Sequence, residues 1–268
     1  MENPSSPKPC PRADDPAQRP APVPLVAWAH EHLLSMLVSL EIAPGSRIGI
    51  DAVARKLGIS QTPIREALSQ LEAEKLGIKV PNVGYHASEQ MTPSEVGDLF
   101  ALRALIEPYA AARTAEAMTD EMLRQLVAME EEMDGLQAEI MIAYARFAKV
   151  DAALHSLIAR GSGNALIADT IERLHMHLHI FRFLFNTNAP QEAAREHAAI
   201  IHALRVRDPA AAEAAMRTHL DRSRVRMEEA SVRIAAPGCA PLACGARDSL
   251  ASAPVLKAFP ARMSVSGN

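Results

Sequence analysis

Glycine is nearly absent from a long central part of this chain of 268 residues. Between residues 98 and 237 only Gly135, Gly161 and Gly163 occur. Alanine, leucine, methionine, arginine and glutamate, which tolerate or favour helices, are plentiful, whereas aromatic residues make up 4% of the chain. This composition predicts an almost wholly helical region.

Proline, glycine and capping residues divide that region into six predicted helices. The sequence Thr92-Pro93-Ser94-Glu95 is typical of a helix N-terminus, and Asp208-Pro209 places an N-cap residue before a proline at the first helical position. The expected helices cover 92–118, 119–135, 138–160, 165–186, 189–207 and 209–234. We therefore predict an antiparallel all-helical bundle of about six helices over residues 91–235.

Residues 25–90 follow a different pattern, in which helices give way to short extended segments. A helical stretch at 25–40 is followed by a turn at 43–46, a short helix over 50–57 that stops at Gly58, and a third helix that begins near Ser60. Extended segments at 78–80 and 85–87 flank a turn at 81–84. Three helices followed by a hairpin indicate a winged helix-turn-helix, so the predicted fold class is mainly α.

The two ends of the chain predict disorder and no membrane partner. Eight of the 19 prolines lie in the first 24 residues, and residues 236–268 are rich in Ala, Ser, Pro and Gly. We expect a disordered arm over 1–24 and a disordered tail over 236–268. Because no uncharged apolar run approaches the ~20 residues of a membrane helix, and the N-terminus lacks a signal-peptide pattern, we expect a cytoplasmic protein.

Charge is distributed unevenly along the chain. The formal net charge is −4, but residues 44–87 carry six basic and four acidic groups, whereas residues 91–235 carry 16 basic and 21 acidic groups. Contact with DNA is therefore expected only from a small patch of the winged helix-turn-helix. The composition permits DNA binding without requiring it.

Four segments carry a resemblance to a known family. They are Ala43–Ile48 (APGSRI), Ala54–Leu68 (ARKLGISQTPIREAL), Leu71–Glu74 (LEAE) and the turn Pro81–Gly84 (PNVG). Together they resemble the DNA-binding domain of GntR-superfamily transcriptional regulators, which implies a homodimer bound to a palindromic operator in double-stranded DNA. The chain departs from the family at Gln61, where Arg is usual, and at Lys75, where Gly is usual. We expect an altered base preference and a different end to the recognition helix.

The predicted DNA contacts lie at the start of the recognition helix and in the wing. Short side chains and free N–H groups at a helix start suit phosphates, and Arg65, one turn further on, can reach guanine. In the alternative interpretation Arg65 pairs with Glu66 or Glu72 and Gln61 is only solvated. The predicted DNA-binding residues are Arg55, Ser60, Gln61, Thr62, Arg65, Asn82 and Gly84.

A second candidate site lies in the helical region. Asp151 and His155 are four residues apart, so a helix presents them on one face. His197 and His219 fall on the fifth and sixth predicted helices, and antiparallel helices could bring all four side chains together. One carboxylate and three imidazoles suit Zn²⁺, and also Ni²⁺, Mn²⁺ or Fe²⁺. Alone, the Asp–His pair is equally compatible with ordinary packing or solvent exposure.

A second resemblance concerns this region. The residues that carry it are Arg103-x3-Glu107, Asp151-x3-His155, Asn164, Glu196-His197 and Met216-x2-His219. They resemble the FCD effector domain of many GntR-type regulators. In that family the corresponding Asp and three His hold a divalent metal ion, and a small carboxylate effector occupies its open coordination positions. The resemblance therefore implies metal binding by Asp151, His155, His197 and His219, whereas the alternative is a buried polar cluster satisfied by water.

Three further residues are predicted to bind the effector: Arg103, Asn164 and His179. Arg103 could clamp a carboxylate with two hydrogen bonds, although a simple helix pair with Glu107 is the alternative. The alternating His175, His177 and His179 cannot all reach one ion from a helix. We expect His179 to line the cavity and the other two to lie on the helix surface.

The function predicted from these features is transcriptional regulation without enzymatic activity. We expect a DNA-binding repressor controlled by a small organic acid at the metal site. A metal-dependent hydrolase or oxygenase that uses Asp151, His155, His197 and His219 is the competing interpretation, since an open metal position can activate water. A helical scaffold with a vestigial wing is a third.

Overall fold

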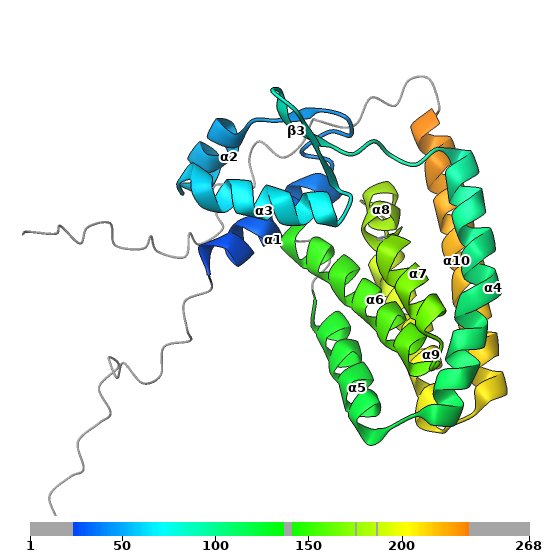
Figure 1. Cartoon of the computed structure of the whole chain (residues 1–268). Helices are drawn as coiled ribbons and strands as arrows, with labels where there is room; N and C mark the ends of the chain where they lie inside the picture. The colour runs from blue at the N-terminus through cyan, green and yellow to red at the C-terminus, as the bar shows by residue number, and fades with distance from the viewer. Residues whose placement is uncertain (1–23, 137–140, 175, 186, 236–268) are drawn as a thin grey trace, which may run out of the picture.

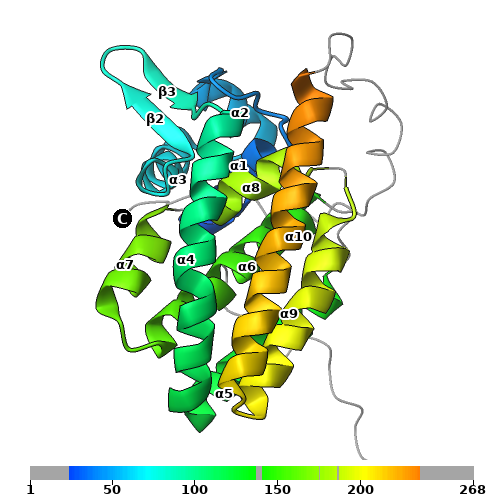
Figure 2. The ribbon, with the colours of Figure 1, turned by 90° about the vertical axis from the view of Figure 1, so that its right-hand side faces the viewer.

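The computed structural model describes residues 24–136, 141–174, 176–185 and 187–235. The expected N-terminal arm, apart from residue 24, and the expected C-terminal tail beyond residue 235 lie outside the described residues, as does His175. These described residues are mainly helical and include one small antiparallel sheet, which confirms the predicted fold class. Figures 1 and 2 show the sheet and the first three helices at one end of a bundle formed by the later helices.

The first part is a winged helix in the order helix, strand, helix, helix, hairpin. Its elements are α1 (Leu25–Val38), β1 (Arg47–Ile48), α2 (Ile50–Leu57), α3 (Gln61–Ala73), β2 (Gly77–Val80) and β3 (Gly84–Ala87). The sheet order is β1-β3-β2, with Ile48 opposite Tyr85 and Val80 opposite Gly84. The two-residue strand β1 was missed by the sequence analysis, because two residues carry no measurable alternation.

Apolar spacing explains how these short helices pack. Leu33 and Leu37 of α1 and Ile64, Leu68 and Leu71 of α3 are fully buried, and α1 packs directly against α3. Each set recurs at three- and four-residue intervals, which places it on one helix face. The opposite face of α3 is thereby left in solvent.

The turn between α2 and α3 follows the predicted punctuation. Gly58 has φ 68°, and its N–H donates to Ala54 O, which ends α2 in the left-handed conformation that glycine favours. Ser60 is the N-cap residue of α3, with an extended backbone, and its side chain makes no capping hydrogen bond. The hydroxyl of Ser60 is therefore available to a partner outside the helix.

Lys75 adopts a left-handed conformation just after α3, with φ 59°. A residue with a side chain is strained there, whereas glycine is not. We expect Lys75→Gly to raise the free energy of unfolding by about 0.5–1 kcal/mol, because the relief of strain exceeds the added flexibility of the unfolded chain. Urea denaturation measures the change. Lys75→Ala, which removes the side chain but keeps the strain, is the matched control, and an equal gain in both variants would contradict the explanation.

The second part is an antiparallel bundle of seven helical segments. They are α4 (Pro93–Ala117), α5 (Asp120–Gly135), α6 (Met141–Gly161), α7 (Ala165–Leu174), α8 (Met176–Phe183), α9 (Ala189–Arg205) and α10 (Pro209–Ala235). The predicted fourth helix, 165–186, is thus described as α7 and α8, on either side of residue 175. Thr92 and Glu95 form a capping box at the start of α4, as their spacing indicates. The long helices α4 and α10 lie side by side, with α6 and α9 behind them (Figure 2).

Polar contacts at two places join the winged helix to the bundle. Lys149 of α6 donates to His30 Nδ1 of α1 at 3.0 Å. The other ring nitrogen, His30 Nε2, lies 3.0 Å from Oε1 of Glu74, the residue that follows α3. Arg182 of α8 is fully buried and donates to Ser88 O at 2.9 Å and Ser88 Oγ at 3.0 Å. The segment between β3 and α4 is therefore anchored to the bundle.

Candidate functional site

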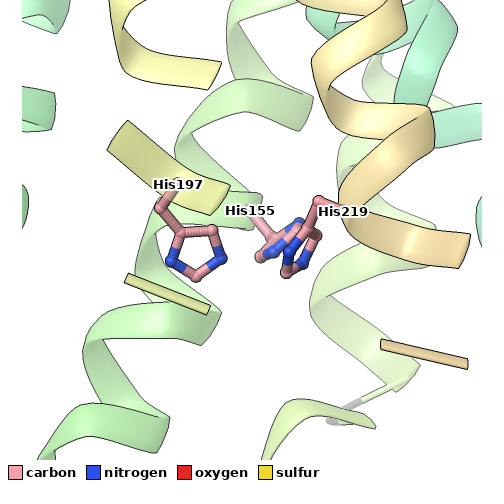
Figure 3. Close-up of side chains that lie close together, drawn as sticks. All are labelled: His155, His197 and His219. Atoms are coloured by element: carbon pink, nitrogen blue, oxygen red, sulfur yellow. The ribbon is translucent and has the colours of Figure 1, made fainter. Parts of the chain in front are cut away.

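The predicted metal ligands lie on three helices of the bundle and face one another. Asp151 and His155 come from α6, His197 from α9 and His219 from α10. All four side chains are buried, with relative exposures of 0–4%. Figure 3 shows the imidazoles of His155, His197 and His219 converging on one space between the helices. The i, i+4 spacing of Asp151 and His155 keeps both on the inward face of α6.

The distances within this cluster are short enough for a single ion. Potential ligand atoms of His155, His197 and His219 lie within 4.8 Å of one another. His197 Nε2 is 3.3 Å from Asp151 Oδ1, and Asp151 also has a potential ligand atom within 4.8 Å of one of His155. The structure therefore brings together the four residues that the sequence predicts as ligands.

Two buried glutamates orient two of the imidazoles. His155 Nδ1 lies 2.5 Å from Glu107 Oε2, and His219 Nδ1 lies 2.8 Å from Glu196 Oε2. A neutral imidazole that donates from Nδ1 carries its lone pair on Nε2. His155 Nε2 is buried and has no hydrogen-bond partner within the described part of the chain. Carboxylates that hold metal-binding imidazoles in this way are a common second layer of metal sites.

Both glutamates are in turn held by arginines. Arg103 Nε donates to Glu107 Oε1 at 2.5 Å, and Arg226 donates to both carboxylate oxygens of Glu196, at 2.8 and 2.9 Å. The Arg103–Glu107 pair, which the sequence analysis weighed as an alternative to effector binding, is therefore formed. Arg103 also borders a small cavity together with Asp151, His219 and Arg226, so its position permits both roles.

Opposite charges and burial set the protonation of the cluster. Burial alone would raise the pKa values of Glu107 and Asp151, but Arg103 and His155 around Glu107, and His177, His197 and His155 around Asp151, outweigh it and lower both. Burial lowers the pKa values of His155, His197 and His219 below the ordinary histidine range. Ionised carboxylates and neutral imidazoles are the forms in which these groups bind divalent cations.

These pKa shifts predict a loss of stability on acidification. Unfolded histidines bind protons with a pKa of about 6.5, whereas the folded imidazoles of the cluster bind them only at lower pH. The unfolded state therefore gains more protons as the pH falls, and the free energy of unfolding decreases. We expect the metal-free protein to be less stable at about pH 5.5 than at about pH 7, a range above the titration of ordinary carboxylates. Urea denaturation in the presence of a chelator at both pH values tests this expectation, and equal stabilities would contradict it.

The sequence analysis missed two kinds of site residue. Glu107 and Glu196 were named only as parts of the family motif, whereas in the structure each contacts an imidazole of the cluster on another helix. His177 was expected at the helix surface, which is wrong, because it is 4% exposed and its Nδ1 lies 2.6 Å from Asp151 Oδ2. Helical spacing could have indicated its burial, since positions 180, 181 and 184 continue the same buried stripe.

Two predicted effector residues are not grouped with the cluster. Asn164 is exposed, and its Oδ1 accepts hydrogen bonds from the backbone N–H groups of Leu166 and Ile167, so it caps α7. His179 is half-buried on α8 and is not among the potential ligand atoms that the described residues place around His155. Arg103 is the one predicted effector residue that borders the cavity beside the cluster.

The predicted DNA-contacting residues lie on an exposed surface of the winged helix. Arg55, Ser60, Gln61, Thr62, Arg65 and Asn82 are exposed, and Gly84 is half-buried. Arg65 donates to Gln61 Oε1 at 3.1 Å, and Gln61 contacts Asp51. Among the described ion pairs neither Glu66 nor Glu72 partners Arg65, so its guanidinium remains on the solvent side of α3.

The wing projects away from the bundle at the same end of the molecule (Figure 2). Asn82 has φ 62° and Gly84 has φ 119°, so the turn between β2 and β3 uses two positive φ angles. Val83 at the tip is 43% exposed. A recognition helix and a projecting hairpin are the two elements with which a winged helix contacts DNA.

An exposed helix-turn-helix with a projecting wing, joined to a separate helical bundle, is typical of a DNA-binding transcriptional regulator. The comparisons agree with this class. The model of bacterial regulatory proteins of the gntR family matches residues 26–86, and the FCD domain model matches residues 98–222.

Two curated relatives of this chain are described as transcriptional regulators. The chain is 29% identical over 190 residues to an HTH-type transcriptional regulator in an unstable DNA locus of Streptomyces ambofaciens, covering 70% of this chain and 78% of that protein. It is 29% identical over 189 residues to the HTH-type transcriptional repressor RspR of Escherichia coli, and the match covers 69% of this chain and 80% of that protein. Among solved structures, E. coli McbR/YncC shares the fold, with a TM-score of 0.56 at 20% identity over 77% of this chain and 98% of that chain.

The chain belongs to the GntR family of bacterial regulatory proteins and carries an FCD domain. It is a DNA-binding transcriptional regulator. The competing interpretation as a hydrolase or oxygenase is not supported, because the relatives named above are described as transcriptional regulators rather than enzymes. Within the described residues no helix has the length and apolar character needed to cross a membrane.

Proposed function

We propose that this regulator is a repressor whose affinity for a palindromic operator is controlled by a small organic acid. Residues 25–90 would bind one half-site per subunit of a homodimer, and residues 91–235 would bind the acid through a divalent ion. GntR-family regulators typically act as dimers, and two recognition helices on one face of the duplex would read half-sites about 34–36 Å apart. The ion would be held by Asp151, His155, His197 and His219.

The observation that carries this proposal is the set of buried nitrogen lone pairs. The Nε2 atoms of His155 and His197 are buried and make no hydrogen bond within the described residues. Leaving such atoms unpaired is costly, and a cation satisfies them. The ionised Asp151 supplies the negative charge that a divalent ion needs. Three imidazoles and one carboxylate suit Zn²⁺, Ni²⁺, Mn²⁺ or Fe²⁺.

The surroundings of the cluster favour an anionic effector. The guanidinium groups of Arg103 and Arg226 border the cavity that also contacts Asp151 and His219. Guanidinium groups bind carboxylates with directed hydrogen bonds. A bound ion would supply positive charge and an open position for a carboxylate oxygen. We expect the dimer to exist in one geometry that binds DNA and another that does not. The effector changes DNA affinity only if it binds these two geometries with different affinities.

Ion titration of the chelator-treated protein tests the metal part of this proposal. We expect isothermal titration with Zn²⁺ to show one site per chain in the natural protein and in His202→Ala, whose histidine is exposed on α9. His219→Ala should bind at least tenfold more weakly. Retardation of a promoter fragment, with and without small carboxylic acids, tests the regulatory part. Equal Zn²⁺ affinity in all three proteins would contradict the assigned site.

Arg65 is expected to contribute to base recognition. We predict that Arg65→Ala weakens specific operator binding by about 1–3 kcal/mol per half-site, because a long cation that can contact guanine is lost. Binding to unrelated DNA at the same salt concentration should change less, since phosphate contacts dominate it. Fluorescence anisotropy at fixed salt measures both affinities. The control is Arg113→Ala, an exposed arginine of α4; an equal loss in both variants would refute the role.

A further inference from the structure

A fourth buried imidazole adjoins the cluster from α8. His177 is 4% exposed, and its ring centroid lies 4.6 Å from that of His155, at an interplanar angle of 33°. Potential ligand atoms of Asp151, His155 and His177 lie within 4.8 Å of one another. The centroids of His197 and His219 are separated by the same 4.6 Å. His177 is therefore as close to His155 as His197 is to His219, and it shares the neighbours Asp151 and His155 with the other imidazoles.

The hydrogen bonding of His177 has the same form as that of His155. In both rings Nδ1 contacts an ionised carboxylate, Asp151 Oδ2 at 2.6 Å for His177 and Glu107 Oε2 at 2.5 Å for His155. In both rings Nε2 is buried and has no hydrogen-bond partner within the described residues. Donation from Nδ1 leaves the lone pair on Nε2. If that argument makes His155 a ligand, it applies equally to His177.

We propose that His177 is a fifth protein ligand of the ion, bound through Nε2, so that the ion is held by four imidazoles and one carboxylate. This inference rests on the proposed metal site. Four protein ligands would leave a six-coordinate ion two open positions, whereas five leave one. The effector would then bind the ion through a single oxygen atom. Five ligands also favour ions that accept five or six donors over tetrahedral zinc.

The position of His177 is compatible with an open site for the effector. His177 borders a hollow lined also by Ala152, Ser156 and Ile171, on the side of α6 and α7. The cavity with Arg103 and Arg226 contacts the cluster instead at Asp151 and His219. Ligation by His177 would therefore not occupy the arginine-lined side of the cluster.

Cobalt substitution tests the ligand assignment directly. In the proton NMR spectrum of the Co²⁺-loaded full chain, each ligating imidazole gives one strongly shifted, exchangeable signal from its remaining N–H group. We expect one such signal fewer in His177→Ala than in the natural protein, and a Co²⁺ affinity at least tenfold lower in competition titration. His202→Ala, which replaces an exposed histidine, should retain every signal and the full affinity.

The outcomes separate this inference from the proposed metal site. Four shifted imidazole signals in the natural protein support it, and this count does not depend on the folding of any variant. Three signals, or an unchanged number in His177→Ala, overturn it and make His177 a residue that only orients Asp151. If the natural protein binds no Co²⁺, the proposed metal site itself fails.

Discussion

Glu107→Ala is expected to destabilise the metal-free protein by about 3–5 kcal/mol, because it leaves the guanidinium of Arg103 buried without its counter-charge. Arg103 is 1% exposed, and Glu107 is the partner of both Arg103 Nε and His155 Nδ1. Urea denaturation in the presence of a chelator measures the change. Each kcal/mol would lower the melting temperature by roughly 2–4 °C for a chain of this size.

The double variant Arg103→Met/Glu107→Met is the control for this effect. Replacement of a whole buried ion pair by apolar residues of similar volume is often nearly neutral, whereas loss of one partner is not. We therefore expect the double variant to recover most of the stability lost in Glu107→Ala. A loss below about 1 kcal/mol in the single variant would show that Arg103 finds another partner or reaches water.

His197→Ala is expected to abolish stabilisation by divalent ions. Both ring nitrogens of His197 are buried without a hydrogen bond in the described structure, so this side chain gains most from an ion. At a free Zn²⁺ concentration one hundred times the dissociation constant, the natural protein should gain about 2.7 kcal/mol in the free energy of unfolding. The variant should gain little at the same concentration.

The substitution itself can change the stability of the metal-free protein, so the stabilisation by Zn²⁺ is measured as a difference within each protein. Unfolding of each protein is measured with Zn²⁺ and with a chelator, and only the difference is compared between proteins. His202→Ala should show the full gain, because its histidine is exposed. A full gain in His197→Ala would place the ion elsewhere.

Local sequence signals predicted where helices begin and end. Gly58, Thr92 and Pro209 stand at the predicted helix boundaries, because capping and backbone preference depend only on neighbouring residues. The family resemblance and the spacing of Asp151 and His155 also predicted the four residues that converge in the bundle. These signals need no knowledge of how the helices pack.

The remaining parts of the site depend on contacts between distant helices. Glu107 and His155 are 48 residues apart, and Glu196 and His219 are 23 residues apart. Which carboxylate meets which imidazole is set by the rotation and tilt of packed helices, and a single sequence does not specify these. The burial of His177, in contrast, could have been predicted from its helical spacing to Ile180, Phe181 and Leu184, but its contact with Asp151 depends on how α8 packs against α6.

The contact of Arg182 with the segment after β3 bears on whether the bundle of this protein can be joined to the winged helix of another regulator. A hybrid that joins this bundle to a foreign winged helix would set Arg182 against a different connecting loop. Its contacts are largely with the backbone carbonyls of Ser88 and Glu89, which any sequence supplies if its path is the same. We therefore expect such a hybrid to keep this junction if its connecting loop follows the same path, whatever the amino-acid sequence of the loop.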